Sequence, residues 1–295
     1  MKKIIIFSTN ILFFLMGYVQ GQELVIPIGH TGGVNSVCFT PNRKYILTGS
    51  DDNTLKLWDI ASSKEIKTYV GHTGWVTCAT VSADGKYALS GSNDLTLILW
   101  NLSTGEAIKT FQGHNDFINA VSISPNGKYA LSGGVDKTVK LWDIATGKEI
   151  RTLTGHTDMV QGVAFSPDGQ KVASCSCDKT IKMWDFATGK ELKTFSGHLN
   201  FVWAVAFSPD GKHIISTSKD KTVKLWDINS GKEISSFIGH TRWVYSISIS
   251  TSGKYALPQV KTVRFAFGKG AQVDYLKPYS TMGYSQLVFR RMRSL

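Results

Sequence analysis

The chain has 295 residues, a formal net charge of +11 at pH 7 and 42% hydrophobic residues. That length can build one large core or two modest domains, and the composition excludes general disorder. An excess of basic residues is typical of proteins that bind nucleic acid. Here, however, the lysines recur at regular intervals and alternate with apolar residues, which predicts that they lie on the solvated side of strands. The charge therefore does not favour nucleic-acid binding. The lysines in question are Lys137, Lys140, Lys179, Lys182, Lys221 and Lys224.

The N-terminal segment has the pattern of a secretory signal peptide. Lys2 and Lys3 precede an apolar stretch from Ile4 to Val19, and short residues follow around Gly21. We therefore expect a signal peptide over residues 1–21 and an exported protein, periplasmic or secreted. A membrane anchor is the alternative, but the stretch is short and interrupted by polar residues. No transmembrane segment is expected after cleavage.

Two residue pairs recur along the chain with a constant interval of 42 residues. The Gly-His pairs are Gly29-His30, Gly71-His72, Gly113-His114, Gly155-His156, Gly197-His198 and Gly239-His240. The Trp-Asp or Trp-Asn pairs are Trp58-Asp59, Trp100-Asn101, Trp142-Asp143, Trp184-Asp185 and Trp226-Asp227. Such a register indicates one structural unit copied in tandem.

Each unit reads as four short strands separated by turns. In the second unit the expected strands are Val76 to Ser82, Tyr87 to Ser90, Leu95 to Trp100 and Ala107 to Phe111. Gly85 and Gly105 lie in the turns, where glycine readily adopts a positive φ. No helical period competes, so the predicted class is all-β.

Gly-His and Trp-Asp at this spacing, with the turn Ser166-Pro167-Asp168-Gly169, resemble the WD40 repeat family over about residues 23–257. The resemblance implies a β-propeller within residues 22–268, with five regular four-stranded blades and a degenerate sixth. It also implies that Glu23 to Ile28 is an outer strand that completes the last blade and closes the ring. Closure of this kind removes exposed sheet edges.

The pattern fails after Leu257, where Pro258-Gln259 replaces the expected Ser-Gly and Gly268 replaces the expected Trp. Shifted codons would permit Asp or Asn from Lys261-Thr262 and Trp or Arg from Phe267-Gly268. We therefore hypothesise a single-base frameshift near codon 257 in a parent protein with more repeats. Residues 269–295 are expected to be a divergent, poorly ordered tail, whereas Val263 to Phe267 alternate as in a makeshift third strand.

Each full repeat also carries a His, a Ser or Thr, an Asp and a Trp at fixed positions. The sets are His30, Thr48, Asp52, Trp58; His72, Ser90, Asp94, Trp100; His114, Ser132, Asp136, Trp142; His156, Ser174, Asp178, Trp184; and His198, Ser216, Asp220, Trp226. Ser, His and Asp suggest a catalytic triad, but a triad occurs once and these sets occur five times. The resemblance implies a structural hydrogen-bonded tetrad in each blade.

No other cluster predicts chemistry, so no enzyme activity, cofactor or metal site is expected. There is no phosphate-binding glycine loop before a helix and no zinc-ligand spacing. The cysteines, which are Cys38, Cys78, Cys175 and Cys177, read as unpaired thiols.

Three positions in each repeat depart from the shared pattern. The first lies three residues after the His and holds Gly33, Trp75, Phe117, Met159, Phe201 and Trp243. The second lies two residues further on and holds Asn35, Thr77, Asn119, Gln161, Trp203 and Tyr245. The third precedes the turn Asp and holds Asp51, Asn93, Val135, Cys177 and Lys219.

Strand alternation directs the first and second positions away from the core valines between them, and the family resemblance places them on the top face around a central channel. Large aromatic residues at non-core positions predict anchors for a partner. The predicted binding residues are Trp75, Phe117, Met159, Phe201, Trp203, Trp243 and Tyr245. The alternative is that these rings pack between blades.

The favoured function is a non-enzymatic scaffold that binds a protein or peptide through the top face. A carbohydrate-binding propeller and the sensor segment of a longer protein stay open as alternatives, because a fold alone does not determine function. The sequence names neither the partner nor the oligomeric state.

Overall fold

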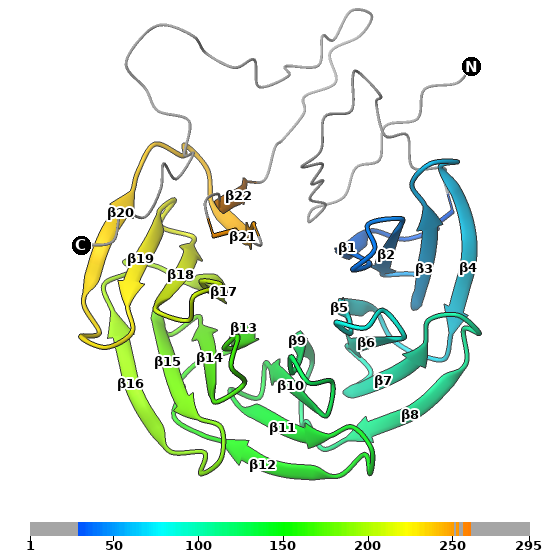
Figure 1. Ribbon diagram of the computed structural model, residues 1–295, viewed down its shortest axis with the longest axis horizontal. Coiled ribbons are helices and arrows are strands. Elements are labelled where there is room, and N and C mark those ends of the chain that lie inside the picture. The colour runs from blue at the N-terminus through cyan, green and yellow to red at the C-terminus, as the bar shows by residue number, and fades with distance from the viewer. Residues whose placement is uncertain (1–28, 251, 254–255, 261–295) are drawn as a thin grey trace, which may run out of the picture.

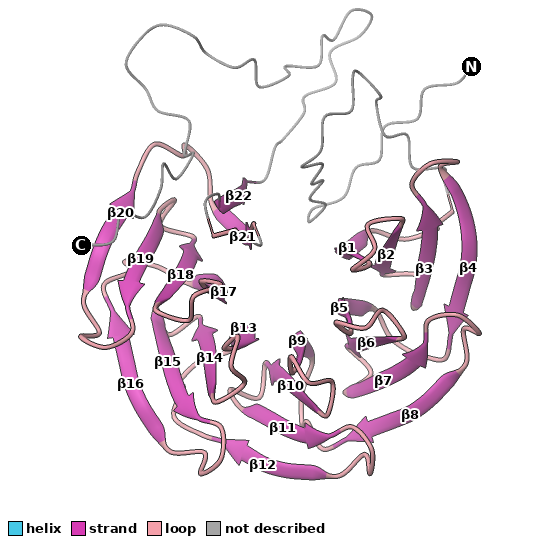
Figure 2. Cartoon of the chain, viewed as in Figure 1, coloured by secondary structure: helices cyan, strands magenta, loops and turns pink. Residues whose placement is uncertain are grey.

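The computed structural model describes residues 29–250, 252–253 and 256–260, and these residues form antiparallel strands and no helix (Figure 2). The strands make five four-stranded sheets and one two-stranded sheet. We number the sheets along the chain as blades 1 to 6.

The strands follow the order of the chain within every blade. Blade 1 holds β1 (Val34–Phe39), β2 (Tyr45–Ser50), β3 (Thr54–Asp59) and β4 (Lys64–Val70), and blade 2 holds β5 (Val76–Val81), β6 (Tyr87–Ser92), β7 (Thr96–Asn101) and β8 (Ala107–Gln112). Blade 3 holds β9 (Ile118–Ile123), β10 (Tyr129–Gly134), β11 (Val139–Asp143) and β12 (Glu149–Leu153). Blade 4 holds β13 (Val160–Phe165), β14 (Lys171–Ser176), β15 (Thr180–Asp185) and β16 (Glu191–Ser196). Blade 5 holds β17 (Val202–Phe207), β18 (His213–Ser218), β19 (Val223–Asp227) and β20 (Glu233–Phe237), and blade 6 holds β21 (Val244–Ile249) and β22 (Ala256–Val260).

The blades are arranged around a central axis (Figure 1). The first strand of each blade faces the centre, the fourth strands form the perimeter, and β1 and β21 lie at the two ends of the arc (Figure 1). This arrangement confirms the all-β propeller with five regular blades. The strands expected at Glu23 to Ile28 and Val263 to Phe267, like the tail 269–295, lie outside the described residues.

The turns follow local backbone chemistry, with one difference from the expectation. Gly85 and Gly105 have φ of 71° and 84°, as their places in the turns predicted. Leu95, expected at the start of a strand, also has a positive φ of 71°, and β7 begins at Thr96. The reason is the preceding residue: the Asp94 carboxylate accepts a hydrogen bond of 2.9 Å from the backbone N–H of Thr96, which tightens the turn around Leu95.

The core lies between neighbouring blades. An aromatic residue on the outer strand of one blade packs edge-on against the repeat Trp of the next, as in Phe111 with Trp142 and Phe195 with Trp226. The ring centroids of these two pairs lie 5.8 and 5.9 Å apart. Trp142 and Trp226 are fully buried, so each blade needs the next one to complete its apolar contacts.

Basic side chains join blades at the perimeter. Lys67 on β4 donates hydrogen bonds of 2.6 and 2.9 Å to the carbonyls of Ser103 and Thr104 in the next blade. Lys109, Arg151 and Lys193 make the equivalent bond from blades 2, 3 and 4. These four basic side chains therefore contribute to contacts between neighbouring blades.

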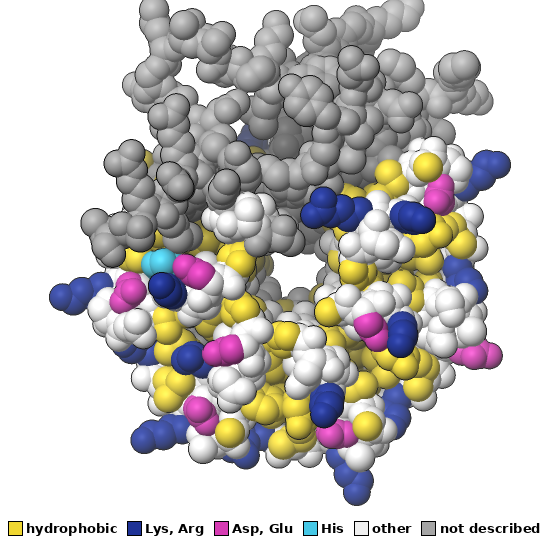
Figure 3. Space-filling view, viewed as in Figure 1, with side chains coloured by type: hydrophobic (Ala, Val, Ile, Leu, Met, Phe, Trp, Pro, Cys, Tyr) yellow, Lys and Arg dark blue, Asp and Glu magenta, His cyan; other side chains and the backbone are white. Residues whose placement is uncertain are grey.

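The strand lysines differ from the expectation of a solvated face. Lys137, Lys179 and Lys221 are exposed in turns, but Lys140 and Lys224 are buried. Lys140 and Lys224 are paired with Glu149 and Glu233, at 2.9 and 2.7 Å, which compensates for their removal from water. On the face drawn in Figure 3, basic and acidic side chains are interspersed around a central opening.

Candidate partner-binding rim

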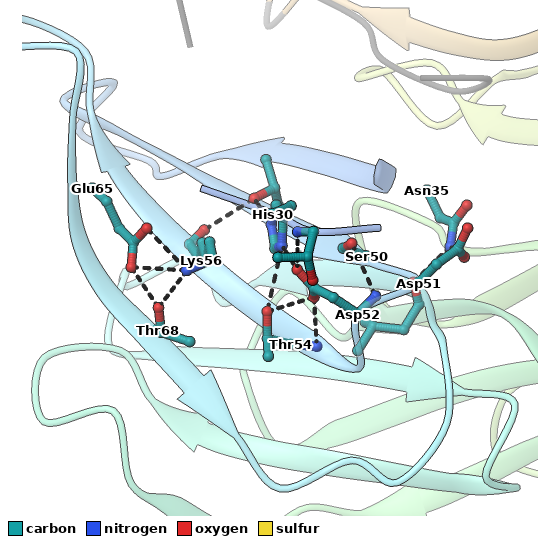
Figure 4. A network of polar contacts seen from close by, with 12 residues as sticks. His30, Asn35, Ser50, Asp51, Asp52, Thr54, Lys56, Glu65 and Thr68 are labelled. Carbon is teal, nitrogen blue, oxygen red and sulfur yellow. Dashed lines mark hydrogen bonds and ion pairs between the residues drawn. The ribbon is translucent and has the colours of Figure 1, made fainter. Parts of the chain in front are cut away.

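The predicted His, Ser or Thr, Asp and Trp sets come together in each of the five complete blades. In blade 2, His72 Nδ1 lies 2.8 Å from Asp94 Oδ2 and His72 Nε2 lies 2.7 Å from Ser90 Oγ. The Trp100 indole N–H donates to the same Ser90 oxygen at 2.8 Å. The sets of the other four blades repeat this arrangement, and Figure 4 shows the surroundings of His30 and Asp52 in blade 1.

Because the Asp carboxylate can only accept, the histidine donates to it from Nδ1. Burial alone would raise the pKa of the Asp136 carboxyl, but hydrogen bonding and charge from His114 outweigh it and hold the pKa well below its ordinary value. The hydroxyl oxygens are enclosed, with Ser90, Ser132, Ser174 and Ser216 fully buried. A nucleophile has to reach its substrate, and these hydroxyls do not.

Blade 6 lacks this network among the described residues. Pro258 occupies the position that holds Ser or Thr in the other blades and has no hydroxyl to offer. Within the described part of the chain, His240 Nε2 is buried without a hydrogen-bond partner. Burial lowers the pKa of this histidine.

We call the three variable positions of the repeat rim positions one to three. Rim position two lines the central opening in every blade, and Trp75 and Asp51 line it from positions one and three. Rim position one immediately precedes the inner strand, as Trp75 precedes β5. The backbone N–H of rim position three bonds to the carbonyl of rim position one, as Lys219 bonds to Phe201 at 2.9 Å. This repeated bond places the two side chains next to each other.

Rim position two is a β-bulge in every blade, and simple alternation did not predict this. Val202 pairs with Ser218 and Ala204 with Thr217, which leaves Trp203 outside the pairing. The same shift occurs at Asn35, Thr77, Asn119, Gln161 and Tyr245. A bulge bends the strand and re-aims its extra residue, and here it directs one residue per blade to the opening. The valines before it, Val76, Val160 and Val202, are fully buried.

The predicted binding residues are partly or largely exposed at this rim. Trp75 is 54% exposed, Phe117 45%, Trp243 42% and Met159 36%. Phe201, Trp203 and Tyr245 are half-buried. The central opening has a volume of about 830 Å³, and Trp75, Trp203 and Tyr245 contribute to its lining.

The two sides of the rim differ in how far their polar groups are satisfied. On blades 1 to 3, the side chains of Asn35, Thr77 and Asn119 each donate to a backbone carbonyl of the next blade. Asn35 also donates to Asp51 at 2.6 Å, and Figure 4 shows the two side by side. These residues hold neighbouring inner strands together.

On blades 5 and 6 the rim is a cluster of rings around one cation. Trp203 lies 5.2 Å from Tyr245 and 6.3 Å from Phe201 between ring centroids. The Lys219 ammonium sits 4.7 Å from the Phe201 ring and 4.3 Å from the Trp243 ring. The sequence analysis placed Lys219 at a variable position without selecting it for binding. The sequence did contain a signal for Lys219, because this residue lies in the chain between Phe201 and Trp243, which are rim position one of blades 5 and 6.

The four cysteines, Cys38, Cys78, Cys175 and Cys177, are free thiols. Burial raises the pKa of the Cys38 and Cys78 thiols to about 12. The described residues contain no group of side chains arranged to hold a metal ion.

Comparison with known families identifies the repeat. The model of the WD domain, G-beta repeat, matches residues 21–59, 63–101, 105–143, 147–185, 189–227 and 231–257. The chain belongs to the WD40 family. Six matches in tandem agree with the six blades of the structure, and the last match is the shortest, as is the last sheet.

The following two relatives are similar to this chain over about one repeat. A ribosome biogenesis protein BOP1 homolog of Drosophila grimshawi is 47% identical over 46 residues, which is 16% of this chain and 6% of that protein. The nuclear distribution protein PAC1 of Candida albicans is 49% identical over 37 residues, which is 12% of this chain and 8% of that protein. The chain thus matches less than a tenth of the length of either relative.

These relatives overturn the predicted location. Ribosome biogenesis and nuclear distribution are processes inside the cell, so the expectation of an exported protein, periplasmic or secreted, is wrong. The segment 1–21, which was interpreted as a signal peptide, lies outside the described residues, and no finding supports that interpretation. Within the described part of the chain, no helix has the length and apolar character to span a bilayer.

Proposed function

We propose that this WD40 propeller is a non-enzymatic scaffold that binds a protein or peptide through its rim. The observation that carries the proposal is the exposure of large rings at rim positions one and two. Exposed Trp and Tyr side chains give contact area at a low cost in conformational entropy and are enriched among interface hot spots.

The contrast between two groups of tryptophans supports this role. Trp58, Trp100, Trp142, Trp184 and Trp226 are buried and donate hydrogen bonds within their blades. Trp75, Trp203 and Trp243 belong to no such network and line or border the central opening. These three rings are therefore candidates for contact with a partner.

We propose a non-enzymatic role because the Ser and Thr hydroxyl groups of the repeated sets are buried. Five equivalent His-Asp pairs are each used within their own blade. The polar rim side chains are also used within the chain, since Asp51 accepts from Asn35 and Thr77 donates to a backbone carbonyl. The names of the matched relatives are consistent with roles in assemblies, but they cover one repeat and do not identify a partner.

The test is capture of a partner by the immobilised chain. We expect the triple variant Trp75→Ala, Trp203→Ala and Trp243→Ala to retain less than about a tenth of the bound partner, since loss of a hot-spot ring costs about 2 kcal/mol or more. The matched control is the triple variant Ile66→Ala, Ile108→Ala and Ile150→Ala, because these side chains are similarly exposed but lie on the outer strands. This control is expected to capture as much as the wild-type chain.

Two results would contradict the proposal. One is equal capture by the wild-type chain and the tryptophan variant when both are folded. The other is binding only on a glycan array run in parallel, which would indicate that the rings stack on sugars.

A further inference from the structure

Hydrogen bonding by rim position two weakens along the chain from blade 1 to blade 5. Rim position two donates to the next blade's carbonyl from Asn35, Thr77 and Asn119, but this series ends at blade 4. Gln161 donates to the Cys177 sulfur, a weak acceptor, at 3.4 Å. Among the described residues, Trp203 Nε1 is buried with no partner at all.

A buried N–H without an acceptor is costly, and binding sites are where such groups are retained. The Trp203 indole could be replaced by a ring without this donor and keep its contacts with Phe201 and Tyr245. The free chain leaves this donor unsatisfied, and an acceptor from a partner would satisfy it once binding shifts the neighbouring rings and exposes the N–H.

On the same side of the rim, the Lys219 ammonium is held between the Phe201 and Trp243 rings, and Phe201 in turn contacts Trp203. No ion pair within the described ranges includes Lys219 or the exposed Arg242, which is adjacent to Trp243. The nearby carboxylate, Asp220, is already used by His198 and Thr222. Two cationic side chains thus lack a counter-charge on this side, whereas the opposite side carries Asp51.

We propose that the rim of blades 5 and 6 binds an acidic side chain of a peptide, an Asp or Glu flanked by apolar residues. Lys219 forms the ion pair and Trp203 Nε1 donates to a carboxylate oxygen, while Phe201, Trp243 and Tyr245 contact the flanking apolar groups. One ammonium and one N–H suit the two oxygens of a carboxylate, whereas phosphate sites are typically built from arginine clusters. This inference rests on the proposed function and specifies the chemistry of the partner.

The test uses an array of synthetic decapeptides in which one Glu or Asp is flanked by Leu and Phe. Copies of each peptide carry Gln, Asn or phosphoserine at the acidic position. The wild-type chain is expected to bind the Glu and Asp peptides about tenfold more tightly than the Gln and Asn copies, as for a charge-assisted hydrogen bond. Lys219→Met is expected to reduce this preference to about twofold or less. Lys212→Met, which removes an exposed lysine from the turn before β18, is expected to behave as the wild type.

Trp203→Phe separates binding from folding. It removes the unpartnered N–H and keeps a ring, so we expect weaker binding of the acidic peptides by about threefold or more with no fall in the midpoint of thermal unfolding. A clear fall in that midpoint would mean that the N–H has a structural acceptor, and would overturn the inference.

The remaining outcomes distinguish this inference from the proposed function. Equal binding of Glu and Gln peptides, an undiminished preference in Lys219→Met, a tenfold preference for phosphoserine or no bound acidic peptide would overturn the inference. If peptides bind without acidic preference and the tryptophan triple variant loses them, the proposed function stands alone. If the triple variant binds every peptide as the wild type does, both are wrong.

Discussion

Leu95 holds a backbone conformation that leucine rarely adopts. Its φ is 71°, and the equivalent residue of blade 1, Asn53, has a φ of 68°. A left-handed conformation costs most residues about 1–2 kcal/mol, and Asn tolerates it better because its short polar side chain bonds locally. The turn geometry is the same in both blades, so Leu95 stores strain that Asn53 avoids.

Replacing Leu95 with Asn is therefore expected to raise the free energy of unfolding by about 0.5–1 kcal/mol. The reverse change, Asn53→Leu, should lower it by a similar amount. Urea unfolding of the two variants and the wild type measures both. A loss of stability in Leu95→Asn would show that the half-buried leucine side chain contributes more by packing than its backbone costs.

The blade carboxylates make stability depend on pH. The pKa values of the Asp94, Asp136, Asp178 and Asp220 carboxyls are well below the ordinary value, because hydrogen bonds from the histidines and threonines outweigh burial. A carboxyl with a lowered folded-state pKa binds fewer protons folded than unfolded, so its contribution is fully present above the unfolded pKa of about 3.9 and is lost as the pH falls through the folded-state value. Burial also lowers the pKa of His30, which shifts part of the loss to the range below about 6.5.

We accordingly expect the free energy of unfolding to decrease slightly from pH 7 to 5 and steeply below pH 4. Asp136→Asn should be less stable than wild type at pH 7 and should show a shallower slope below pH 4, because one of the blade carboxyls no longer takes up its proton. Chemical unfolding at a series of pH values measures the slope. Stability that rises as the pH falls below 4 would contradict the role of these carboxylates.

At the scale of the blade, a lysine on the third strand pairs with a glutamate on the fourth in every complete blade except blade 2. In blade 3, Lys140 Nζ lies 2.9 Å from Glu149 Oε2 and 2.8 Å from Thr152 Oγ1. Blade 2 has Ile98 and Ala107 at the corresponding positions. Both partners differ together there, so neither charge is left buried alone.

This difference between blades gives a double-mutant cycle. Glu149→Ala leaves the Lys140 ammonium buried without its carboxylate and is expected to cost about 1–2 kcal/mol. The pair Lys140→Ile with Glu149→Ala reproduces blade 2 and should lie within about 1 kcal/mol of wild type. Urea unfolding of the two single variants and the double variant measures the coupling. Additive costs would mean that the pair does not interact.

The sequence was informative about blades and less so about where single side chains point. The interval of 42 residues predicted the blades, and Gly85 and Gly105 marked turns because glycine freely adopts a positive φ. Alternation could not predict the bulge at Trp203, because a bulge is defined by pairing with another strand. Likewise, Lys140 reads as a surface residue until its pairing with Glu149 is known.

At the scale of the whole molecule, the rim and the perimeter have different roles. Perimeter lysines and buried tryptophans join each blade to the next, and the rim residues of blades 1 to 3 also do so through their amides and hydroxyl. The rings of blades 5 and 6 contact one another and Lys219 at the opening. The blades are thus held together by one set of residues, and the proposed binding residues are a different set.

The measurement that tests this division most directly is the free energy of unfolding of two variants. Trp142→Ala removes a buried ring from between two blades and is expected to cost about 3–5 kcal/mol. The triple variant Trp75→Ala, Trp203→Ala and Trp243→Ala is expected to cost about 1 kcal/mol or less for each ring removed, because these rings are largely or half exposed. If each rim ring costs as much as Trp142, or if the triple variant does not fold, the rim tryptophans are packing residues and the binding role assigned to them is wrong.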